Sequence, residues 1–334
     1  MVSAWLWVAS MVPAFFVLNE GAKLVTDNAA VIARRSGRSK FVVGVLLVAT
    51  LGALPEILVA VFFMLGGGGN LAIGSVLGSN ILNTSVLIGL PAVFIPIAIN
   101  REILARDIVF LTVVTFVVAA LLQDGELAQL EGVVLILLFI PYAANLLATE
   151  RLAKGTDLAE LATESEVELE LMGHLFGKKM TIRAGFKWVF IGVALLVLGA
   201  EAVTRGAEGI LTLFQLPPFE VGITVVAIGT SLPDMAAAIQ AVRRGHPDLA
   251  LAIGIGASIF TLLLTLGIMG LGFHAEQVFD RTDLRISTFV MMAQVSFVLL
   301  FSATGRFIRR WEGSVLFSFY PIYVTLELLF HRRG

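Results

Sequence analysis

The chain has 334 residues and a formal net charge of −2, and 58% of its residues are hydrophobic while only 14% are charged. Soluble domains usually carry about 25% charged residues, so this composition excludes an ordinary soluble protein. The small negative net charge offers no basic surface for a nucleic acid. Because the chain has no cysteine, disulfides and thiol chemistry are excluded as well.

Long apolar runs dominate the chain from its beginning to its end. A helix needs about 20 apolar residues to cross a bilayer, whereas strands of a membrane barrel alternate over segments of about 10 residues. We therefore predict an all-α polytopic membrane protein with ten transmembrane helices, the first of which stays in the mature chain because it lacks a cleavage site. In chain order the predicted spans cover residues 3–31, 40–65, 70–98, 104–122, 129–149, 186–212, 218–242, 247–273, 284–303 and 312–330.

Basic residues are distributed unevenly between the predicted loops. When the loops are assigned alternately to the two sides of the membrane, 17 Lys and Arg residues fall on one side and 4 on the other. Cytoplasmic loops carry the excess of basic residues. We therefore expect a multi-pass protein of the plasma (inner) membrane with both termini extracytoplasmic.

The two halves of the chain match each other at one constant offset in the numbering. Gly21-Ala22 matches Gly199-Ala200, and Leu54-Pro55-Glu56 matches Leu232-Pro233-Asp234, in a register that continues without a gap as far as Ile81 and Ile259. Each half, 1–149 and 186–334, holds five predicted spans. Because five is odd, the second half starts from the opposite side, so the sequence predicts two inverted-topology repeats. Transporters are commonly built this way, with the binding site near the bilayer midplane.

A hydrophilic linker, residues 150–185, separates the two halves. We interpret it as a solvated cytoplasmic helix, because its spacing fits no calcium-binding loop; a regulatory cation site is the alternative. Its acidic character comes from Glu160, Glu164, Glu166, Glu168 and Glu170.

Two acidic residues, Glu56 and Asp234, lie in the middle of predicted spans. A charged group at that depth costs about 2.5–3.5 kcal/mol on insertion scales and is a functional-site hypothesis by default. Each follows a proline, which has no N–H and leaves the carbonyl of Leu51 or Gly229 without its helical partner. We therefore expect both helices to be irregular at Gly52–Pro55 and Gly229–Pro233, with free carbonyl oxygens beside the carboxylates. Hard cations prefer such oxygen ligands.

The spans that follow the two acids carry small and polar residues. Ser79 and Asn83 are four residues apart and so share one face of a helix, and Gly74 and Gly78 allow close approach of a neighbouring helix. The alternative is that these residues serve helix packing alone. The second span carries the corresponding set: Gly254, Gly256, Ser258 and Thr261.

Two further pairs of opposite charge lie within predicted spans. Glu20 precedes Lys23 by three residues and Glu201 precedes Arg205 by four, which is the spacing of neighbours on a helix surface. We predict local ion pairs near the helix ends, with gating as the alternative. The four histidines show no metal-ligand spacing.

The stretches Gly229-Thr230-Ser231-Leu232-Pro233-Asp234 and Gly78-Ser79-Asn80-Ile81-Leu82-Asn83 resemble the α-repeats of the sodium/calcium exchanger (cation/calcium antiporter) superfamily. The resemblance covers both pairs of motifs and the ten-span plan. It implies that Glu56 and Asp234 are the central acids, which bind calcium and sodium alternately. It also implies that the first helices of the repeats, 3–31 and 186–212, slide to alternate access. Further ligands are implied at the carbonyls of Gly52 and Thr230 and at the side chains of Ser79, Asn83 and Ser231.

The chain departs from the family pattern at four positions. Ala53 and Ala257 stand where serine is usual, Asp234 replaces glutamate, and Thr261 stands where asparagine or aspartate is expected. We expect the calcium site to be retained and the sodium sites to have fewer oxygen ligands, with Thr261 as the remaining ligand of its position.

These features predict a secondary active cation antiporter that exchanges sodium and calcium. A calcium/proton exchanger is the first alternative, because a buried carboxylate can carry protons; an intramembrane enzyme and a channel are more distant. The expected partners are inorganic cations (Ca2+, Na+ or H+) and the lipid bilayer. No cofactor, nucleic acid or obligatory protein partner is expected.

Overall fold

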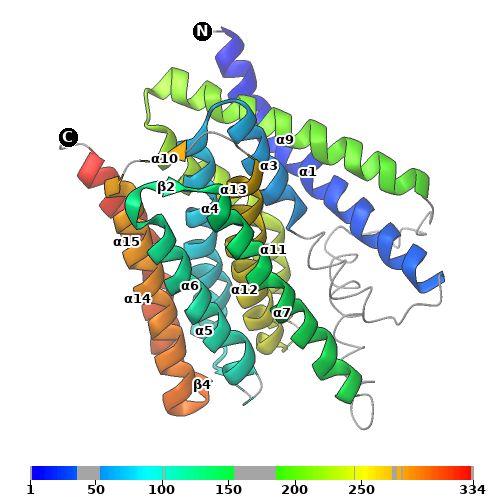
Figure 1. Ribbon diagram of the computed structural model, residues 1–334, viewed down its shortest axis with the longest axis vertical. Helices are drawn as coiled ribbons and strands as arrows, with labels where there is room; N and C mark the ends of the chain where they lie inside the picture. Colours follow the sequence, from blue (N-terminus) through cyan, green and yellow to red (C-terminus); the bar gives the residue numbers. More distant parts are fainter. Residues whose placement is uncertain are drawn as a thin grey trace.

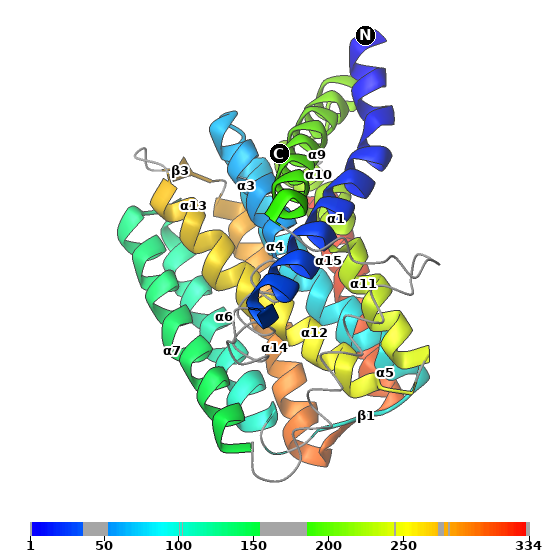
Figure 2. The same cartoon turned by 90° about the vertical axis from the view of Figure 1, so that its right-hand side faces the viewer.

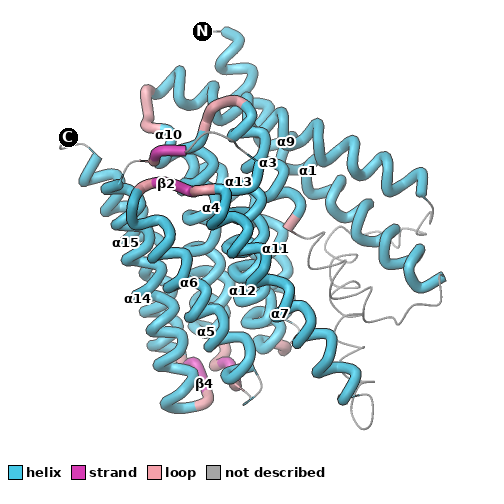
Figure 3. The backbone as a smooth tube through the Cα atoms, viewed as in Figure 1, coloured by secondary structure: helices cyan, strands magenta, loops and turns pink. Residues whose placement is uncertain are grey.

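The computed structural model describes residues 2–35, 53–99, 101, 103–153, 186–243, 245–272, 277–279 and 281–331, and these are nearly all helical (Figures 1 and 3). Seven helices or runs of adjoining helices in this part of the chain are long and apolar enough to cross a membrane. Two shorter apolar helices, Leu54–Leu65 and Gln129–Ala144, accompany them. The prediction of an all-α polytopic membrane protein is therefore confirmed in its main feature.

The first half of the chain begins with the long helix α1 (Val2–Arg35), and helical structure lies within each predicted span. Only 53–65 of the span predicted at 40–65 is described, and the acidic linker lies outside the described residues apart from its first four. The later elements of this half are α3 (Leu54–Leu65), α4 (Gly69–Leu82), the π-helical turn η2 (Asn83–Gly89), α5 (Leu90–Phe94), β1 (Ile97–Ala98), the π-helical turn η3 (Ile103–Ile108), α6 (Val109–Leu121), the 3-10 turn η4 (Leu122–Asp124), β2 (Glu126–Leu127) and α7 (Gln129–Ala153).

The second half, like the first, begins with a long helix, α9 (Phe186–Phe214). In Figure 1, α1 and α9 run side by side across one side of the molecule. The later elements are α10 (Pro218–Val221), the π-helical turn η5 (Gly222–Val226), α11 (Ala227–Arg243), α12 (Pro247–Phe260), the π-helical turn η6 (Thr261–Thr265), α13 (Leu266–Gly272), β3 (Gln277–Val278), α14 (Arg281–Gly305), β4 (Phe307–Ile308) and α15 (Arg310–His331).

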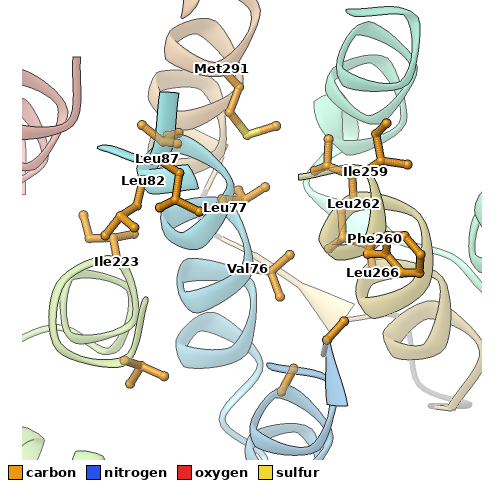
Figure 4. Packing of buried hydrophobic residues seen from close by; sticks show 14 of the residues in the cluster. Val76, Leu77, Leu82, Leu87, Ile223, Ile259, Phe260, Leu262, Leu266 and Met291 are labelled. Carbon is orange, nitrogen blue, oxygen red and sulfur yellow. The ribbon is translucent and has the colours of Figure 1, made fainter. Parts of the chain in front are cut away.

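The centre of the molecule is the run α4–η2–α5, which other helices enclose almost completely as far as Ala92, while its last residue, Phe94, is exposed. Its side chains meet those of η5, α12, η6 and α14 in one apolar cluster, of which Figure 4 shows Leu77, Ile223, Leu262 and Met291 among others. A helix that is apolar all round is buried in this way. The polar residues on it are therefore inside the protein and away from lipid.

Glycines bring α4 into backbone contact with the second half of the chain. A Cβ on Gly74 would lie 2.6 Å from the carbonyl oxygen of Phe219, and one on Gly78 would lie 2.6 Å from Cα of Ile223. The predicted role of these two glycines in close helix approach is confirmed. Gly21 of α1 and Gly199 of α9, at equivalent positions of the repeat, are each packed against the other helix in the same way.

Two short antiparallel strand pairs join loops of the first half to loops of the second. Strand β1 pairs with β4, and β2 pairs with β3. The N–H of Ile99 donates to Arg306 O and that of Phe279 donates to Gly125 O, both at 2.7 Å. Ile99 directly follows β1 and Phe279 directly follows β3, while Gly125 and Arg306 directly precede β2 and β4. The two contacts are therefore counterparts of each other in the two halves. The views in Figures 1 and 2 place the two pairs at opposite ends of the molecule.

Candidate cation site

Glu56 lies in the first turn of α3, with Pro55 beside it near the helix start. Proline is favoured there, because the first turn of a helix has no use for its missing N–H. Glu56 is 7% exposed, so its carboxylate is buried at the start of an apolar helix. Gly52, the predicted carbonyl ligand of this half, lies outside the described residues.

Asp234 lies on α11, which runs unbroken from Ala227 to Arg243. The predicted irregularity at Gly229–Pro233 is therefore wrong. Proline removes a single backbone hydrogen bond, and packing of α11 against α4 and α12 keeps the rest of the helix regular. The irregular turn lies earlier, in the π-helical segment η5. Asp234 itself is partly buried.

The two acids, one from each half of the chain, approach each other through Ser231, which lies three residues before Asp234 on α11 and contacts Glu56. Ser231 Oγ donates to Glu56 Oε1 at 3.5 Å, and the Ser79 and Thr230 hydroxyls lie 3.5 Å apart. These contacts bring together oxygen atoms from α3, α4 and α11. Of the eight predicted site residues, the structure thus gathers Glu56, Asp234, Ser231, Ser79 and Thr230.

Asn83 and Thr261 complete the predicted set, and both are fully buried. The amide of Asn83 and the hydroxyl of Thr261 have no hydrogen-bond partner among the described residues. Each is the first residue of a π-helical turn, η2 or η6, and the two occupy equivalent positions of the repeat. Such π turns are rare and occur frequently at functional sites. Leaving a buried polar group unpaired costs about 1–3 kcal/mol, so these two positions require an explanation.

The crossing of α4 and α12 contains polar contacts that sequence reasoning did not assign. Asn80 Nδ2 donates to Ser258 O at 3.2 Å, and the Thr84 and Ser258 hydroxyls are 3.4 Å apart. Asn80 and Ser258 are themselves equivalent positions of the repeat, so this contact joins the two halves at corresponding places. Sequence reasoning also missed Gln294 of α14. An amide side chain in the middle of an apolar span is unusual, and this signal could have identified it.

The two predicted ion pairs form, but they lie in the middle of the long helices α1 and α9 rather than near the helix ends, because these helices extend well beyond the pairs on both sides. Lys23 Nζ lies 2.7 Å from Glu20 Oε1, and Arg205 lies 2.7 Å from Glu201 Oε1. Both pairs are local and partly exposed. In the part of the chain that the structure describes, no group of three His, Cys, Asp or Glu residues could hold a metal ion. The candidate site therefore combines two carboxylates with neutral oxygen atoms.

Comparison with known proteins identifies similar chains over nearly the whole length. A family model described as sodium/calcium exchanger protein matches residues 6–148 and 185–329. The chain is 30% identical to the inner membrane protein YrbG of Escherichia coli, over 73% of each chain. It is also 30% identical to the sodium/calcium exchanger MaX1 of Methanosarcina acetivorans, over 92% of this chain and 95% of the relative. A solved structure of the sodium-calcium exchanger NCX_Mj shares the fold, with a TM-score of 0.62 at 24% identity over 96% of this chain and 99% of that one.

Proposed function

The chain belongs to the sodium/calcium exchanger family and is a membrane transporter rather than an enzyme, and from this membership we propose that it exchanges sodium for calcium as a secondary active antiporter. Glu56 and Asp234 bind one Ca2+ between them, and Na+ competes for the same region. The carbonyls of Gly52 and Thr230 and the side chains of Ser79, Asn83, Ser231 and Thr261 supply the remaining oxygen ligands.

One observation carries this proposal most strongly. Glu56 is buried, and Ser231, three residues before Asp234 on α11, donates a hydrogen bond to it, so two carboxylates from helices far apart in the chain come together inside an apolar protein. Such an arrangement is costly unless a cation compensates it. The buried oxygens of Asn83 and Thr261, which lack partners among the described residues, are further ligands of the kind that hard cations take.

The proposed mechanism requires two inverted halves of five spans each. Two observations support the inverted arrangement. The turns η2 and η6 begin at equivalent positions of the repeat, and the corresponding strand pairs lie at opposite ends of the molecule (Figures 1 and 2). Helices α3, α7 and α15 bring the seven long apolar runs to ten spans. Access to the site then alternates when α1 and α9 slide over the remaining helices.

The orientation in the membrane follows from the basic residues. The β1 and β4 loops, which pair with each other, both fall on the side that the distribution of Lys and Arg marks as cytoplasmic. The β2 and β3 loops fall on the other side. Helix α1 begins and α15 ends at the β2–β3 end of the molecule in Figure 1, which supports extracytoplasmic termini in the plasma (inner) membrane.

Proton exchange is the second candidate function. Thr261 replaces the asparagine or aspartate expected by family resemblance, and Ala257 replaces a serine, so the second half offers fewer neutral ligands for sodium. The deeply buried Glu56 is suited to carry a proton in place of Na+.

Calcium uptake into proteoliposomes, driven in turn by outward gradients of Na+, H+ and K+, tests the proposal. Sodium exchange predicts uptake with the Na+ gradient alone, and uptake driven only by H+ selects the second candidate. Uptake without any counter-gradient indicates a channel, and the absence of uptake under all conditions rejects the proposed function.

A further inference from the structure

A buried amide on α14 contacts the turn of helix that carries Asn83. Gln294 is 1% exposed, and its Nε2 donates to Ile81 O at 3.1 Å and to Ser85 Oγ at 2.5 Å. Met291, three residues earlier on α14, lies in the same contact with the α4–η2 run (Figure 4). One face of α14 therefore lies directly against the junction of α4 and η2.

The two acceptors of Gln294 flank Asn83 in the sequence. The side chain of Asn83 makes no hydrogen bond among the described residues, so no hydrogen bond of its own amide fixes where its oxygen points. Its direction depends on the backbone at the start of η2, and π-helical turns are rare, single-turn structures. From a fully buried side chain, one hydrogen bond holds the backbone carbonyl of Ile81 before Asn83, and the other holds the hydroxyl of Ser85 after it.

From this geometry we infer that Gln294 is a positioning residue for cation coordination by Asn83. It touches no ion; it fixes the turn from which Asn83 reaches the site. The inference rests on the proposed function, because it assigns a role to a ligand of that same site. Residues that orient metal ligands typically change metal affinity or activity by about 10- to 100-fold when they are removed.

The corresponding turn of the second half, which begins at Thr261, has no matching amide. Counting along the chain from equivalent strands places Gln294 opposite Val114 of α6 when β1 and β3 are matched, and opposite Val113 when β2 and β4 are matched. Valine has no side-chain donor. Thr115, the next residue, donates its hydroxyl to Leu111 O within its own helix at 2.8 Å. Among the described residues, the positioning contact is therefore found on the Asn83 side and has no counterpart at this position of α6.

The test measures sodium binding separately from stability. Unfolding temperature is recorded in detergent over a series of Na+ concentrations, which gives both the stability without ion and an apparent dissociation constant for Na+. Gln294→Met preserves length and apolar packing and removes both hydrogen bonds. We expect its dissociation constant for Na+ to rise about tenfold. Ser302→Ala, which removes a buried hydroxyl of α14 that has no partner among the described residues, is the matched control and should leave the constant unchanged.

A double variant with Asn83→Ala separates positioning from a general effect on the fold. Once Asn83 is alanine, Gln294→Met should change the dissociation constant no further. If Gln294→Met does not fold, Ser85→Ala removes one acceptor and should weaken Na+ binding less, again only while Asn83 is present. An unchanged constant in Gln294→Met, or equal effects with and without Asn83, overturns the inference. A wild-type protein without any Na+-dependent shift rejects the proposed sodium exchange instead.

Discussion

Replacing Glu56 by glutamine removes the charge of the buried acid, leaves the partly buried Asp234, and keeps the shape of the side chain. For a carboxylate and a divalent ion at about 2.4 Å, with an effective dielectric constant of about 20, the gross attraction is about 14 kcal/mol. If loss of hydration offsets about four-fifths of it, about 3 kcal/mol remains, which corresponds to an affinity about 100-fold weaker. The fold should persist, because the change removes a buried charge.

The assay is calcium uptake driven by an outward Na+ gradient, with variants reconstituted at matched protein levels. At calcium concentrations below the wild-type half-saturation point, Glu56→Gln and Asp234→Asn should each reduce the uptake rate about 100-fold. Glu208→Gln, which neutralises an exposed acid of α9, should retain the wild-type rate. Wild-type uptake in Glu56→Gln would show that the central carboxylate is not a ligand and would refute this reasoning.

Three other predictions address the counter-ion, the packing and the topology. Thr261→Asn should be tolerated and should steepen the dependence of calcium flux on Na+, since it adds a stronger oxygen ligand; a flux curve identical to wild type contradicts it. Gly78→Ala should lower the free energy of unfolding by about 1–3 kcal/mol, because its Cβ would lie 2.6 Å from a backbone atom of η5, whereas Gly66→Ala, with 3.5 Å of clearance, should change stability little in a thermal unfolding assay. Single cysteines at Gln123 and Thr304, equivalent exposed positions of the two halves, should react with a membrane-impermeant maleimide from opposite sides; labelling from the same side contradicts inverted repeats.

The positions of the helices could be predicted because hydrophobicity over about 20 residues is a strong pattern. The acids could be predicted as a pair because a carboxylate in an apolar span is expensive and because Glu56 and Asp234 occupy matched positions. The ion pair of Glu20 with Lys23 followed from helical spacing alone. Each of these features depends on neighbouring residues in the sequence or on the cost of placing a residue in the bilayer, and both can be read from the sequence.

What the sequence did not predict depends on contacts between distant segments. The π-helical turns at Asn83 and Thr261 and the regular helix through Pro233 are decided by packing against neighbouring helices, which overrides the local preference of the chain. The strand pairs are only two residues long, too short for an alternating pattern. Gln294 lies 209 residues from Ser85, and a single amide in an apolar helix does not reveal which turn it contacts.

The central claim is that Glu56 and Asp234 bind one calcium ion in common, and calcium titration by calorimetry tests it most directly. The purified wild-type protein and its Glu56→Gln and Asp234→Asn variants are titrated with Ca2+ in sodium-free buffer. A shared site predicts one Ca2+ per chain in the wild type and an affinity about 100-fold weaker in either single variant. Retention of wild-type affinity in one of the two variants, or two independent Ca2+ per chain of which each variant loses one, would contradict a shared site.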